Sequence, residues 1–426
     1  MNAFPGASGF GKGSRGGRAG RIIFVTNLED SGPGSLRECT ESEGPRNCVF
    51  RIGGIIELKK PIIVKKDSDS LSILGQTAPG DGILLTINSK DDTAKLTPFL
   101  IKNTHDIIVR HLRVRPQVSN TIRNVDAFTV ENSKQIYLDH VSGSWATDEN
   151  FNAHSDTTNL TVAYSIFGEG LNKHSKCALL GSDPSGPQNI TFWRNACVSN
   201  RDRNPDDNHF GGSCIEITNN IFFNALSEWG EVFSQYPGGT PIIYSENFFK
   251  AGASTKDETF AINWNPINSV AKPKIYAHNN KVASPKSKSL VLIAPDTEPY
   301  IVSTPPCSQS APEIGSADAA YEEVRTRSGA FPRDAVDNRF IEEIGLPSVF
   351  GKGSMVTTPG QLPTMRSANP YIDEDGDGMA DVMEASVGAI VGKADPWIDG
   401  DNNGWSNFDD FMQLLSDERI AGRYSK

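Results

Sequence analysis

Six stretches in the middle of the sequence are alike and recur at nearly even intervals. Each is a short run of alternating, β-branched or aromatic residues that ends at a polar corner. With the corner residues taken as equivalent, the steps between them are 25, 30, 25, 27 and 32 residues, at His140, Ser165, Asn195, Asn220, Asn247 and Asn279. A β-rich unit of this length is typical of a solenoid whose coils stack on one another. We therefore predict an all-β fold, a right-handed parallel β-helix, with corner side chains hydrogen-bonded along its axis.

The rest of the chain divides around these repeats. Before them, short β-branched runs bounded by turn-forming residues predict further strands between residues 21 and 114. After about residue 295 the regularity fades, and residues 304–360 are rich in Pro, Ser and Gly, with one helical-looking piece at 319–327. We predict three parts: a β-helix over 1–300, a wrapping segment over 301–368 and a small helical module over 369–426.

The composition fits a soluble globular protein of 426 residues, with 37% hydrophobic and 22% charged residues. No apolar run is long enough to span a membrane, so we expect no membrane partner. The net charge is −11, and residues 371–410 carry −10 of it through eleven acids and one base. The remainder is nearly neutral, whereas a nucleic-acid-binding body would normally show a basic excess.

The acidic stretch contains the sharpest local motif in the chain. Residues 373–384 match the EF-hand loop pattern at every specified position, and residues 399–410 repeat it with Asp at the end. Carboxylates at alternate positions, a Gly at the sharp turn and an acid at the last position suit Ca²⁺. We predict two calcium loops that stabilise their own module, with helical stretches at 382–391 and 407–415. The predicted ligands are Asp373, Asp375, Asp377, Met379, Asp381 and Glu384 in the first loop, and Asp399, Asp401, Asn403, Trp405, Asn407 and Asp410 in the second.

We predict the chemistry around the strand at 190–195. Lys176 precedes this strand, and Arg201 and Arg203 follow it in a polar turn, so a rigid strand would hold these cations on its flanking loops. Cations beside a strand, taken alone, are more often an ordinary solvated rim than a site. Trp145 could face a sugar ring, although most aromatic residues of the repeats fit the core.

Five stretches together resemble the pectate lyases of polysaccharide lyase family one. They read FPGASGFG at 4–11, VTNLEDSGPGSLR at 25–37, GQTAPGDG at 75–82, DHVSGSW at 139–145 and RNP at 203–205. The likeness covers roughly residues 4–280, and bacterial members of that family often end in an acidic calcium module. The resemblance implies a right-handed parallel β-helix that cleaves polygalacturonate by calcium-assisted β-elimination with an Arg as the base.

The resemblance also implies roles for single residues. Asp126, Asp148 and Asn152 fall where the family places calcium ligands, although a carboxylate is more usual at the last position. Lys176 resembles the lysine that holds a uronate carboxylate, and Arg203 matches the base.

The substrate-binding set expected from the chain is Lys176, Arg201, His209 and Trp145. A second arginine usually follows the base within a few residues. Here the positions after Pro205 hold Asp206, Asp207, Asn208 and His209 instead.

The residue types suit this chemistry. The proton to be removed lies α to a uronate carboxylate, and Ca²⁺ together with Lys176 would stabilise the charge that develops. Arginine has an ordinary pKa above about 12. Arg203 can therefore act as a base only where neighbouring cations disfavour its charged form, which predicts an alkaline optimum.

Two other functions stay open. A non-catalytic or tailspike-like β-helix would bind an acidic polysaccharide without cleaving it, and the missing second arginine slightly favours that reading. A glycoside hydrolase would need two carboxylates flanking the scissile bond. Asp148 and Glu149 are adjacent, so on a strand they would point to opposite faces and make a poor pair.

The cysteines and the start of the sequence bear on location. Six cysteines permit an oxidising compartment, and Cys39 and Cys48 are near enough to close one loop, with the pairing of the other four left open. The start lacks the basic and apolar segments of a signal peptide. We expect a secreted monomer, with its signal peptide absent from this sequence, whose partner is polygalacturonate and whose cofactor is Ca²⁺.

Overall fold

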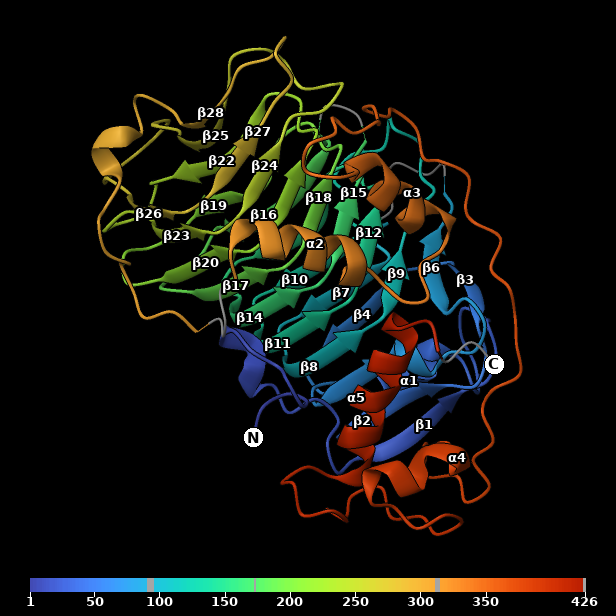
Figure 1. Cartoon of the computed structure of the whole chain (residues 1–426). Helices are drawn as coiled ribbons and strands as arrows, with labels where there is room; N and C mark the ends of the chain where they lie inside the picture. Colours follow the sequence, from blue (N-terminus) through green and yellow to red (C-terminus); the bar gives the residue numbers. More distant parts are fainter. Residues whose placement is uncertain (90–95, 172–173, 311–314, 424–426) are drawn as a thin grey trace.

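The computed structural model describes residues 1–89, 96–171, 174–310 and 315–423. In these ranges the strands form three parallel sheets that run along a solenoid (Figure 1). From β2 onward, successive strands pass from one sheet to the next, so neighbours within a sheet lie about one coil apart in sequence. The predicted all-β solenoid of stacked parallel strands is confirmed.

The three sheets are named here by their strands. Sheet A contains β1 (Arg21–Val25), β2 (Arg46–Phe50), β5 (Leu71–Leu74), β8 (His105–Arg110), β11 (Lys134–Asp139), β14 (Thr158–Ala163), β17 (Asn189–Trp193), β20 (Cys214–Thr218), β23 (Pro241–Ser245) and β26 (Lys274–His278). Sheet B contains β3 (Gly54–Leu58), β6 (Ile83–Ile87), β9 (Leu112–Val114), β12 (Ser142–Ser144), β15 (Ile166–Gly168), β18 (Ala196–Val198), β21 (Ile221–Phe223), β24 (Phe248–Lys250) and β27 (Lys281–Ala283). Sheet C contains β4 (Ile62–Lys65), β7 (Phe99–Lys102), β10 (Phe128–Glu131), β13 (Glu149–His154), β16 (Lys176–Ser182), β19 (Asp206–Asn208), β22 (Glu228–Phe233), β25 (Thr259–Trp264) and β28 (Leu290–Ile293).

Helices are few and lie outside the solenoid. The α-helices are α1 (Leu36–Glu41), α2 (Ala317–Arg327), α3 (Ala335–Ile344), α4 (Asp381–Glu384) and α5 (Asn407–Ile420), and short 3-10 turns are η1 (Phe10–Gly13), η2 (Gly75–Thr77), η4 (Glu298–Tyr300) and η5 (Ala385–Val387). None of the described helices is long and apolar enough to cross a membrane.

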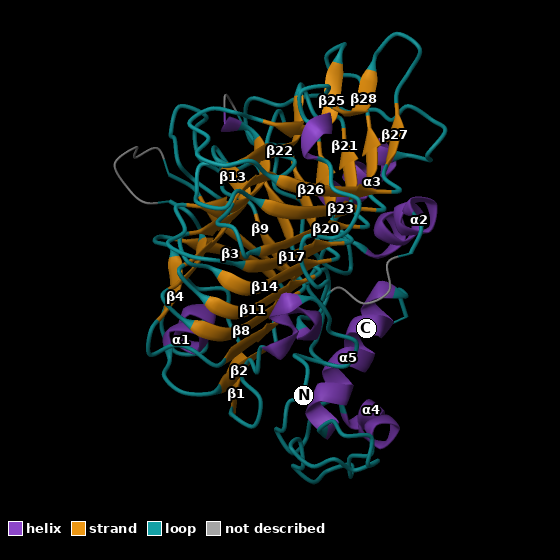
Figure 2. Cartoon of the chain, turned by 90° about the vertical axis from the view of Figure 1, so that its left-hand side faces the viewer, coloured by secondary structure: helices purple, strands orange, loops and turns teal. Residues whose placement is uncertain are grey.

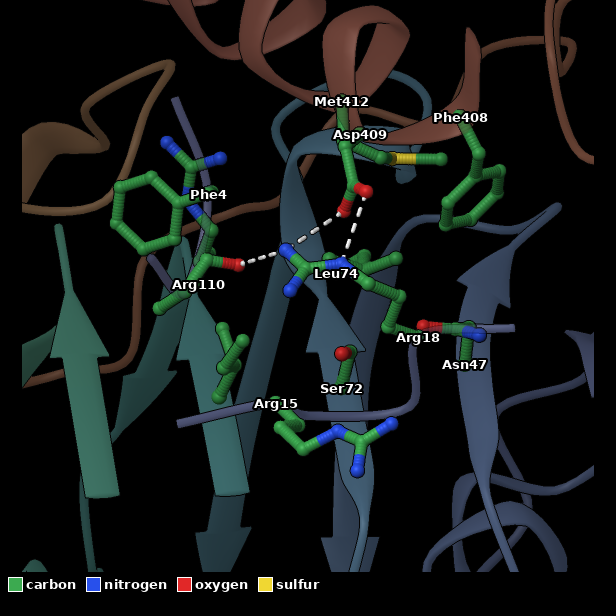
Figure 3. Close-up of a pocket in the computed structure, with 12 residues that line it drawn as sticks. Phe4, Arg15, Arg18, Asn47, Ser72, Leu74, Arg110, Phe408, Asp409 and Met412 are labelled. Carbon is green, nitrogen blue, oxygen red and sulfur yellow. Dashed lines mark hydrogen bonds and ion pairs between the residues drawn. The ribbon is translucent and has the colours of Figure 1, made fainter. Parts of the chain in front are cut away.

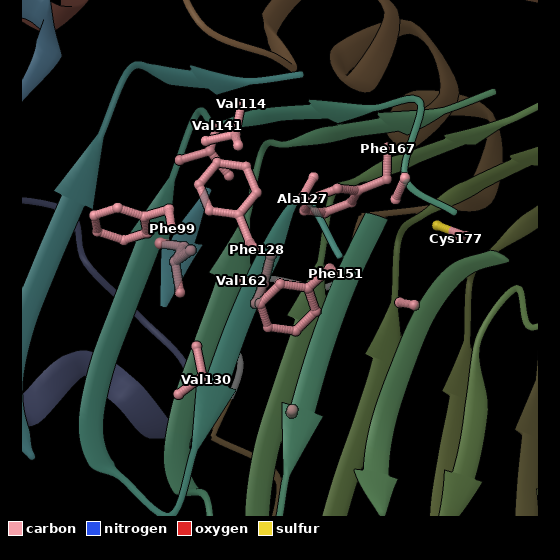
Figure 4. Close-up of a cluster of buried hydrophobic side chains, with 14 of the residues drawn as sticks. Phe99, Val114, Ala127, Phe128, Val130, Val141, Phe151, Val162, Phe167 and Cys177 are labelled. Carbon is pink, nitrogen blue, oxygen red and sulfur yellow. The ribbon is translucent and has the colours of Figure 1, made fainter. Parts of the chain in front are cut away.

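The interior of the solenoid is filled by side chains that stack from coil to coil. Phe99, Phe128 and Phe151 are register partners on three neighbouring strands of sheet C, and all three are fully buried. Figure 4 shows them lined up in the core, with Phe167 of sheet B facing them. Removing these rings from water is the main force that holds the coils together.

A ladder of asparagine side chains closes one corner of the solenoid. The side-chain oxygens of Asn195, Asn220, Asn247 and Asn280 each accept a backbone N–H from the preceding coil, which confirms the predicted hydrogen bonding along the axis. The two ends of the predicted series are wrong by one residue. Asn280 takes the position that was expected for Asn279, and His140 is level with Tyr164, on whose ring it stacks at 4.9 Å. Strand register decides these positions, because a shift of one residue turns a side chain to the other face.

The segment after the solenoid folds back over sheet B. It contains two helices, α2 and α3, where the sequence predicted one. Buried residues of both helices pack on the outer face of sheet B, and the Phe340 ring of α3 lies over Gly168 of β15. A Cβ at Gly168 would stand 2.9 Å from that ring, so this close approach needs glycine.

The acidic tail also packs against the solenoid, at its N-terminal end. Phe408, Phe411 and Met412 of α5 share one buried cluster with Val49 and Leu74 of sheet A. Figures 1 and 2 show α5 beside the first strands of sheet A, with α4 next to it.

Polar contacts line the same interface. The Nε of Arg18 lies 3.0 Å from the Oδ2 of Asp409 (Figure 3), and the Nη2 of Arg110 donates to the Oε1 of Gln413 and the Oγ of Ser416, each at 3.1 Å. The tail is therefore joined to the solenoid by both apolar and charged contacts, and it does not fold as a free appendage.

The tail helices differ from the prediction in extent. The helix predicted at 382–391 is only the four residues of α4 followed by η5, whereas α5 runs five residues beyond its predicted end at 415. No helix lies between residues 345 and 380, all of which are described, so the first loop lacks the leading helix of an EF-hand.

Three disulfides cross-link the described chain. Cys39 pairs with Cys48, as its spacing allowed. Cys177 pairs with Cys197, and Cys214 pairs with Cys307, which ties the start of the wrapping segment to sheet A.

Candidate active site

The candidate residues gather at one edge of sheet C. Asp126 stands just before β10, Asp148 just before β13, Lys176 at the start of β16 and Arg203 just before β19. Because these strands are parallel and adjacent, their starting ends lie side by side, about 4.8 Å apart from strand to strand. Residues that are up to 77 positions apart in sequence, Asp126 and Arg203, are thereby brought to one edge.

Three carboxylates form a cluster at this edge. Asp126, Asp148 and Glu149 each place an oxygen within 4.8 Å of the others. Thr129 donates to Asp126 at 2.6 Å, and the Glu149 backbone N–H donates to Asp126 at 3.1 Å. Burial raises the pKa of both Asp126 and Glu149 above their ordinary values, and the neighbouring carboxylates add to the rise. The expectation that Asp148 and Glu149 would point apart is wrong, because β13 begins at Glu149 and Asp148 lies outside the strand.

Asn152 lies next to this cluster with its amide engaged. Its Nδ2 donates to the Oδ2 of Asp126 at 3.1 Å, while its buried Oδ1 has no hydrogen-bond partner among the described residues. The predicted trio of Asp126, Asp148 and Asn152 is thus together in space, but the third carboxylate of the cluster is Glu149. From the sequence, Glu149 was expected only to assist these ligands, whereas the structure places its carboxylate in the cluster itself.

Two cations close the cluster from the neighbouring strands. The Nζ of Lys176 lies 3.2 Å from Asp148 and 3.4 Å from Glu149, and the Nδ1 of His174 lies 3.0 Å from the same Nζ. The Nη1 of Arg203 lies 2.5 Å from the Oε1 of Glu149. His174 was missed because it falls outside every motif that the sequence suggested.

Asp206 holds the other side of Arg203. Its Oδ2 lies 2.7 Å from the Nε of Arg203, and the side chain is buried. Asp206 occupies the stretch where a second arginine is usual, so the departure in the sequence changes the partner of the base candidate. Glu231 on the next strand is the register partner of Asp206 and extends the acidic surface.

The surroundings of Arg203 differ from the expectation. Burial disfavours its charged form, but Asp206 and Glu149 outweigh burial and raise the pKa of Arg203 above its ordinary value. A role as base requires neighbouring cations that lower this pKa. That requirement is not met by the protein residues alone, because the nearest charged partners are carboxylates.

Two predicted substrate-binding residues are buried away from the site edge. Trp145 is 1% exposed and donates its indole N–H to Glu169 at 2.9 Å, beneath the wrapping segment, where a Cβ on Gly360 would stand 2.6 Å from its ring. His209 is fully buried, with Nδ1 bonded to Gln188 at 2.7 Å. Neither side chain can contact a polysaccharide, so both predictions are wrong. Arg201 lies half-buried, with its backbone bonded to Ser175 beside Lys176, and its role stays a prediction.

The two tail loops have the same internal hydrogen bonds. In each, the first Asp accepts the backbone N–H groups of the fifth and sixth residues, as Asp373 does from Asp377 and Gly378, and as Asp399 does from Asn403 and Gly404. The ninth side chain, Asp381 or Asn407, accepts the N–H of the second residue. The repeated motif therefore folds into a repeated loop.

The two loops differ in how far their predicted ligand oxygens are already hydrogen-bonded within the protein. Oxygens of Asp373, Asp375 and Asp377 lie within 4.8 Å of one another, and Glu384 is fully buried with neither carboxylate oxygen hydrogen-bonded within the described structure. Burial raises the pKa of Glu384 to about 7. In the second, more exposed loop, the Asn403 amide already donates to Asp401 and Asp410. Asn407 also donates to Asp395. Met379 and Trp405 show backbone N–H bonds to the fifth residue of their loops, and their predicted carbonyl roles stay predictions.

Comparisons with known proteins place the chain. No protein-family model matches the sequence. Over 434 residues the chain is 30% identical to probable pectate lyase C of Aspergillus flavus, which covers 99% of this chain and 95% of that protein. It is 33% identical over 396 residues to probable pectate lyase C of Neosartorya fischeri, covering 91% and 87%. The crystal structure of the major allergen from cedar pollen shares the fold, with a TM-score of 0.55 at 18% identity over 76% of this chain and 92% of that one.

These similarities and the site edge of sheet C define the class first: the chain is an enzyme, a polysaccharide lyase on a parallel β-solenoid. Within that class the chain belongs to the pectate lyase family.

Proposed function

We propose that this enzyme is a calcium-dependent lyase that cleaves polygalacturonate, or a related polyuronate, by β-elimination with Arg203 as the base. The observation that carries the proposal is the cluster of Asp126, Asp148 and Glu149 flanked by Lys176 and Arg203 on one edge of sheet C. The names of the fungal relatives support the substrate class.

The residues at this edge fit a calcium ion. Ca²⁺ prefers carboxylate and amide oxygens, and the cluster offers three carboxylates together with the unpartnered Oδ1 of Asn152. When bound there, calcium would neutralise a substrate carboxylate and favour loss of the adjacent proton. Burial and the neighbouring carboxylates raise the pKa of Asp126 and Glu149, and a cation bound between them would favour their ionised forms.

The chain's own residues divide the remaining work. Lys176 would hold the uronate carboxylate of the sugar whose C5 proton is removed. Arg203 would take that proton while the C5–H electrons form the C4–C5 double bond and the C4–O4 bond breaks, with O4 leaving as the end of the other fragment. Because Glu149 and Asp206 favour the charged guanidinium, the base role requires that calcium and Lys176 lower the pKa of Arg203, and the rate would then rise with pH.

Other features support a secreted enzyme with calcium in its tail. Three disulfides suit an oxidising compartment, and an acidic polysaccharide outside the cell would be the partner of a monomer. The buried, unpartnered Glu384 beside Asp373, Asp375 and Asp377 suits a second calcium ion. This ion would have a structural role, since the first tail loop packs near the start of sheet A.

A second function is favoured by one observation. Arg203 is held by two carboxylates and no second arginine follows it, so the site edge could bind an acidic polysaccharide without cleaving it. One assay separates the functions: ultraviolet absorbance of the unsaturated product from polygalacturonate, with calcium and with chelator. We expect a rise in absorbance that the chelator abolishes. New reducing ends without absorbance would show a hydrolase, and binding with neither signal would show the non-catalytic β-helix.

A further inference from the structure

We propose that Glu149 is both the third carboxylate of the calcium site and the group that restrains Arg203, so that calcium binding draws Glu149 from Arg203. The inference rests on the proposed function and deepens it. It concerns a residue that the sequence suggested only as an assisting ligand, and it makes calcium binding and release of the base candidate one event.

Glu149 stands between two sets of partners. One of its carboxylate oxygens lies within 4.8 Å of oxygens of both Asp126 and Asp148. Its Oε1 lies 2.5 Å from Nη1 of Arg203 and 3.4 Å from Nζ of Lys176. The side chain is 2% exposed, so its carboxylate interacts with these protein groups, or with an ion bound beside them, and little with bulk water.

The charges at the edge favour Glu149 as a further carboxylate ligand. Asp126 and Asp148 supply two negative charges, and Lys176 and Arg203 supply two positive charges within the same contacts. Asp206, which pairs with Arg203, brings the net charge of the set to −1, and Glu149 makes it −2, which matches the charge of a divalent cation. Asn152 cannot supply the charge, because it is neutral and turns its amide N–H toward Asp126.

Arg203 would stay in place after it loses Glu149. Its Nε remains 2.7 Å from the buried carboxylate of Asp206, which fixes the direction of the side chain. The Nη1 atom, now bonded to Glu149, would be left free to face substrate. Asp206 is thus the permanent partner of Arg203, and Glu149 is the exchangeable one.

Calorimetric titration with CaCl₂ tests the ligand role directly. The background carries Asp377→Asn and Asp401→Asn, so that the tail loops contribute little. We expect Glu149→Gln to weaken calcium binding at the β-helix site by about tenfold or more, because the count of charged ligands sets the affinity. Asn152→Asp is the matched compensating change, and it should restore most of the affinity of Glu149→Gln. A Glu149→Gln variant that binds within twofold of the background, or a double variant that gains nothing, overturns the proposal.

The sharing of Glu149 is tested by a double-mutant cycle. Arg203→Gln removes the competing partner, so it should tighten calcium binding when Glu149 is present and have a clearly smaller effect in Glu149→Gln. An equal effect of Arg203→Gln in both backgrounds would show simple charge removal and would overturn the exchange. Should Glu149→Gln fail to fold, Glu149→Asp takes its place in the cycle, because its shorter side chain keeps the charge while weakening the contact with Arg203.

The same titrations separate this inference from the proposed function. If the background protein binds no calcium at the β-helix site, the calcium-dependent function fails. If it binds calcium and Glu149→Gln binds equally well, only the role of Glu149 fails.

Discussion

Arg203 is the residue whose environment most affects the chemistry. Two carboxylates, Glu149 and Asp206, form ion pairs with it from opposite sides, and these pairs stabilise its positive charge. If Arg203 only attracts the acidic substrate, a positive charge at this position is sufficient, whereas a base must also hold its accepting atom in the right place. A lysine could keep the charge, but it could not reproduce the two-sided guanidinium contacts.

We therefore predict that Arg203→Lys folds and keeps most of its substrate affinity, while turnover falls by at least about a hundredfold, the lower end of what a positioned base contributes. Steady-state kinetics on polygalacturonate in the presence of calcium measure both the turnover and the substrate affinity of this variant. Lys176→Ala should weaken both binding and rate, because it removes a contact to the substrate carboxylate in ground and transition states alike. A folded Arg203→Lys enzyme with near-parental turnover would leave Arg203 as a rim cation.

Asp139 provides a prediction on pH and stability. Burial opposes its ionised form, but His140 and Arg110 outweigh burial and lower the pKa of Asp139 below its ordinary value. The folded state therefore binds this proton less readily than the unfolded state, whose pKa is about 3.9. The ionised Asp139 therefore adds to the free energy of unfolding at pH values above about 3.9, and this stabilisation is lost as the pH falls below that value.

The expected result is a gap between the parent and Asp139→Asn in the free energy of unfolding that is clear at pH 6 and narrows toward pH 3. Denaturant unfolding of both proteins at each pH, in the same calcium concentration, measures it. A gap that is constant over this range would contradict the assigned cause.

At the scale of elements, Phe340 is the largest of the α3 side chains that pack on sheet B, and it lies over a glycine. Phe340 is fully buried against β15 and β18, and its fit depends on the absent side chain of Gly168. We predict that Phe340→Ala lowers the free energy of unfolding by about 3–5 kcal/mol, because it leaves a cavity in the interface. Glu342→Ala, on the exposed side of the same helix, should stay within about 0.5 kcal/mol. Equal losses in the two variants would refute this account of how α3 is held.

The loop at 373–384 gives a prediction about metal removal. The buried carboxylate of Glu384 has no partner among the described residues, and an ion bound only to the folded state stabilises it by about 2.7 kcal/mol at a hundred times its dissociation constant. We expect calcium to raise the thermal midpoint of the parent, and most of that rise to disappear in Glu384→Gln.

Asp410→Asn is the matched control in the second loop, whose carboxylates already accept from Asn403, and it should keep most of the calcium effect. Thermal scans with and without chelator compare the three proteins. If Asp410→Asn lost more of the calcium-induced rise in thermal midpoint than Glu384→Gln, the second loop and not the first would be the main calcium site of the tail.

At the scale of the whole molecule, the tail covers the first coils of the solenoid while the site edge lies several strands further along. Removing residues 369–426 would expose Val49 and Leu74 and would remove the partner of Arg18. We predict a clear fall in thermal midpoint, with turnover at a temperature where the truncated protein is folded remaining within a few-fold of the parent. A folded, inactive truncation by circular dichroism would show that the tail acts on the chemistry.

The local patterns in the sequence were sufficient for the solenoid, the asparagine ladder and the two repeated tail loops. Each depends on spacing within one coil or one loop, and such spacing repeats the same backbone geometry wherever it occurs. At the site edge, Lys176 and Arg203 were expected beside one strand, whereas Asp126 and Asp148 were expected from the resemblance to the pectate lyases; the parallel stacking of the strands brings the four to one edge.

The tertiary structure alone decided which side chains share that edge and which are covered. Strand register placed Asn280 in the ladder, and the start of β13 turned Glu149 toward Asp148. The wrapping segment covered Trp145 through a contact with Gly360, more than 200 residues away. The tail likewise packs on the N-terminal coils through a long-range contact, since Phe408 and Leu74 share one buried cluster. Burial and ion pairing depend on segments that fold over one another at long range, and no local pattern carries that information.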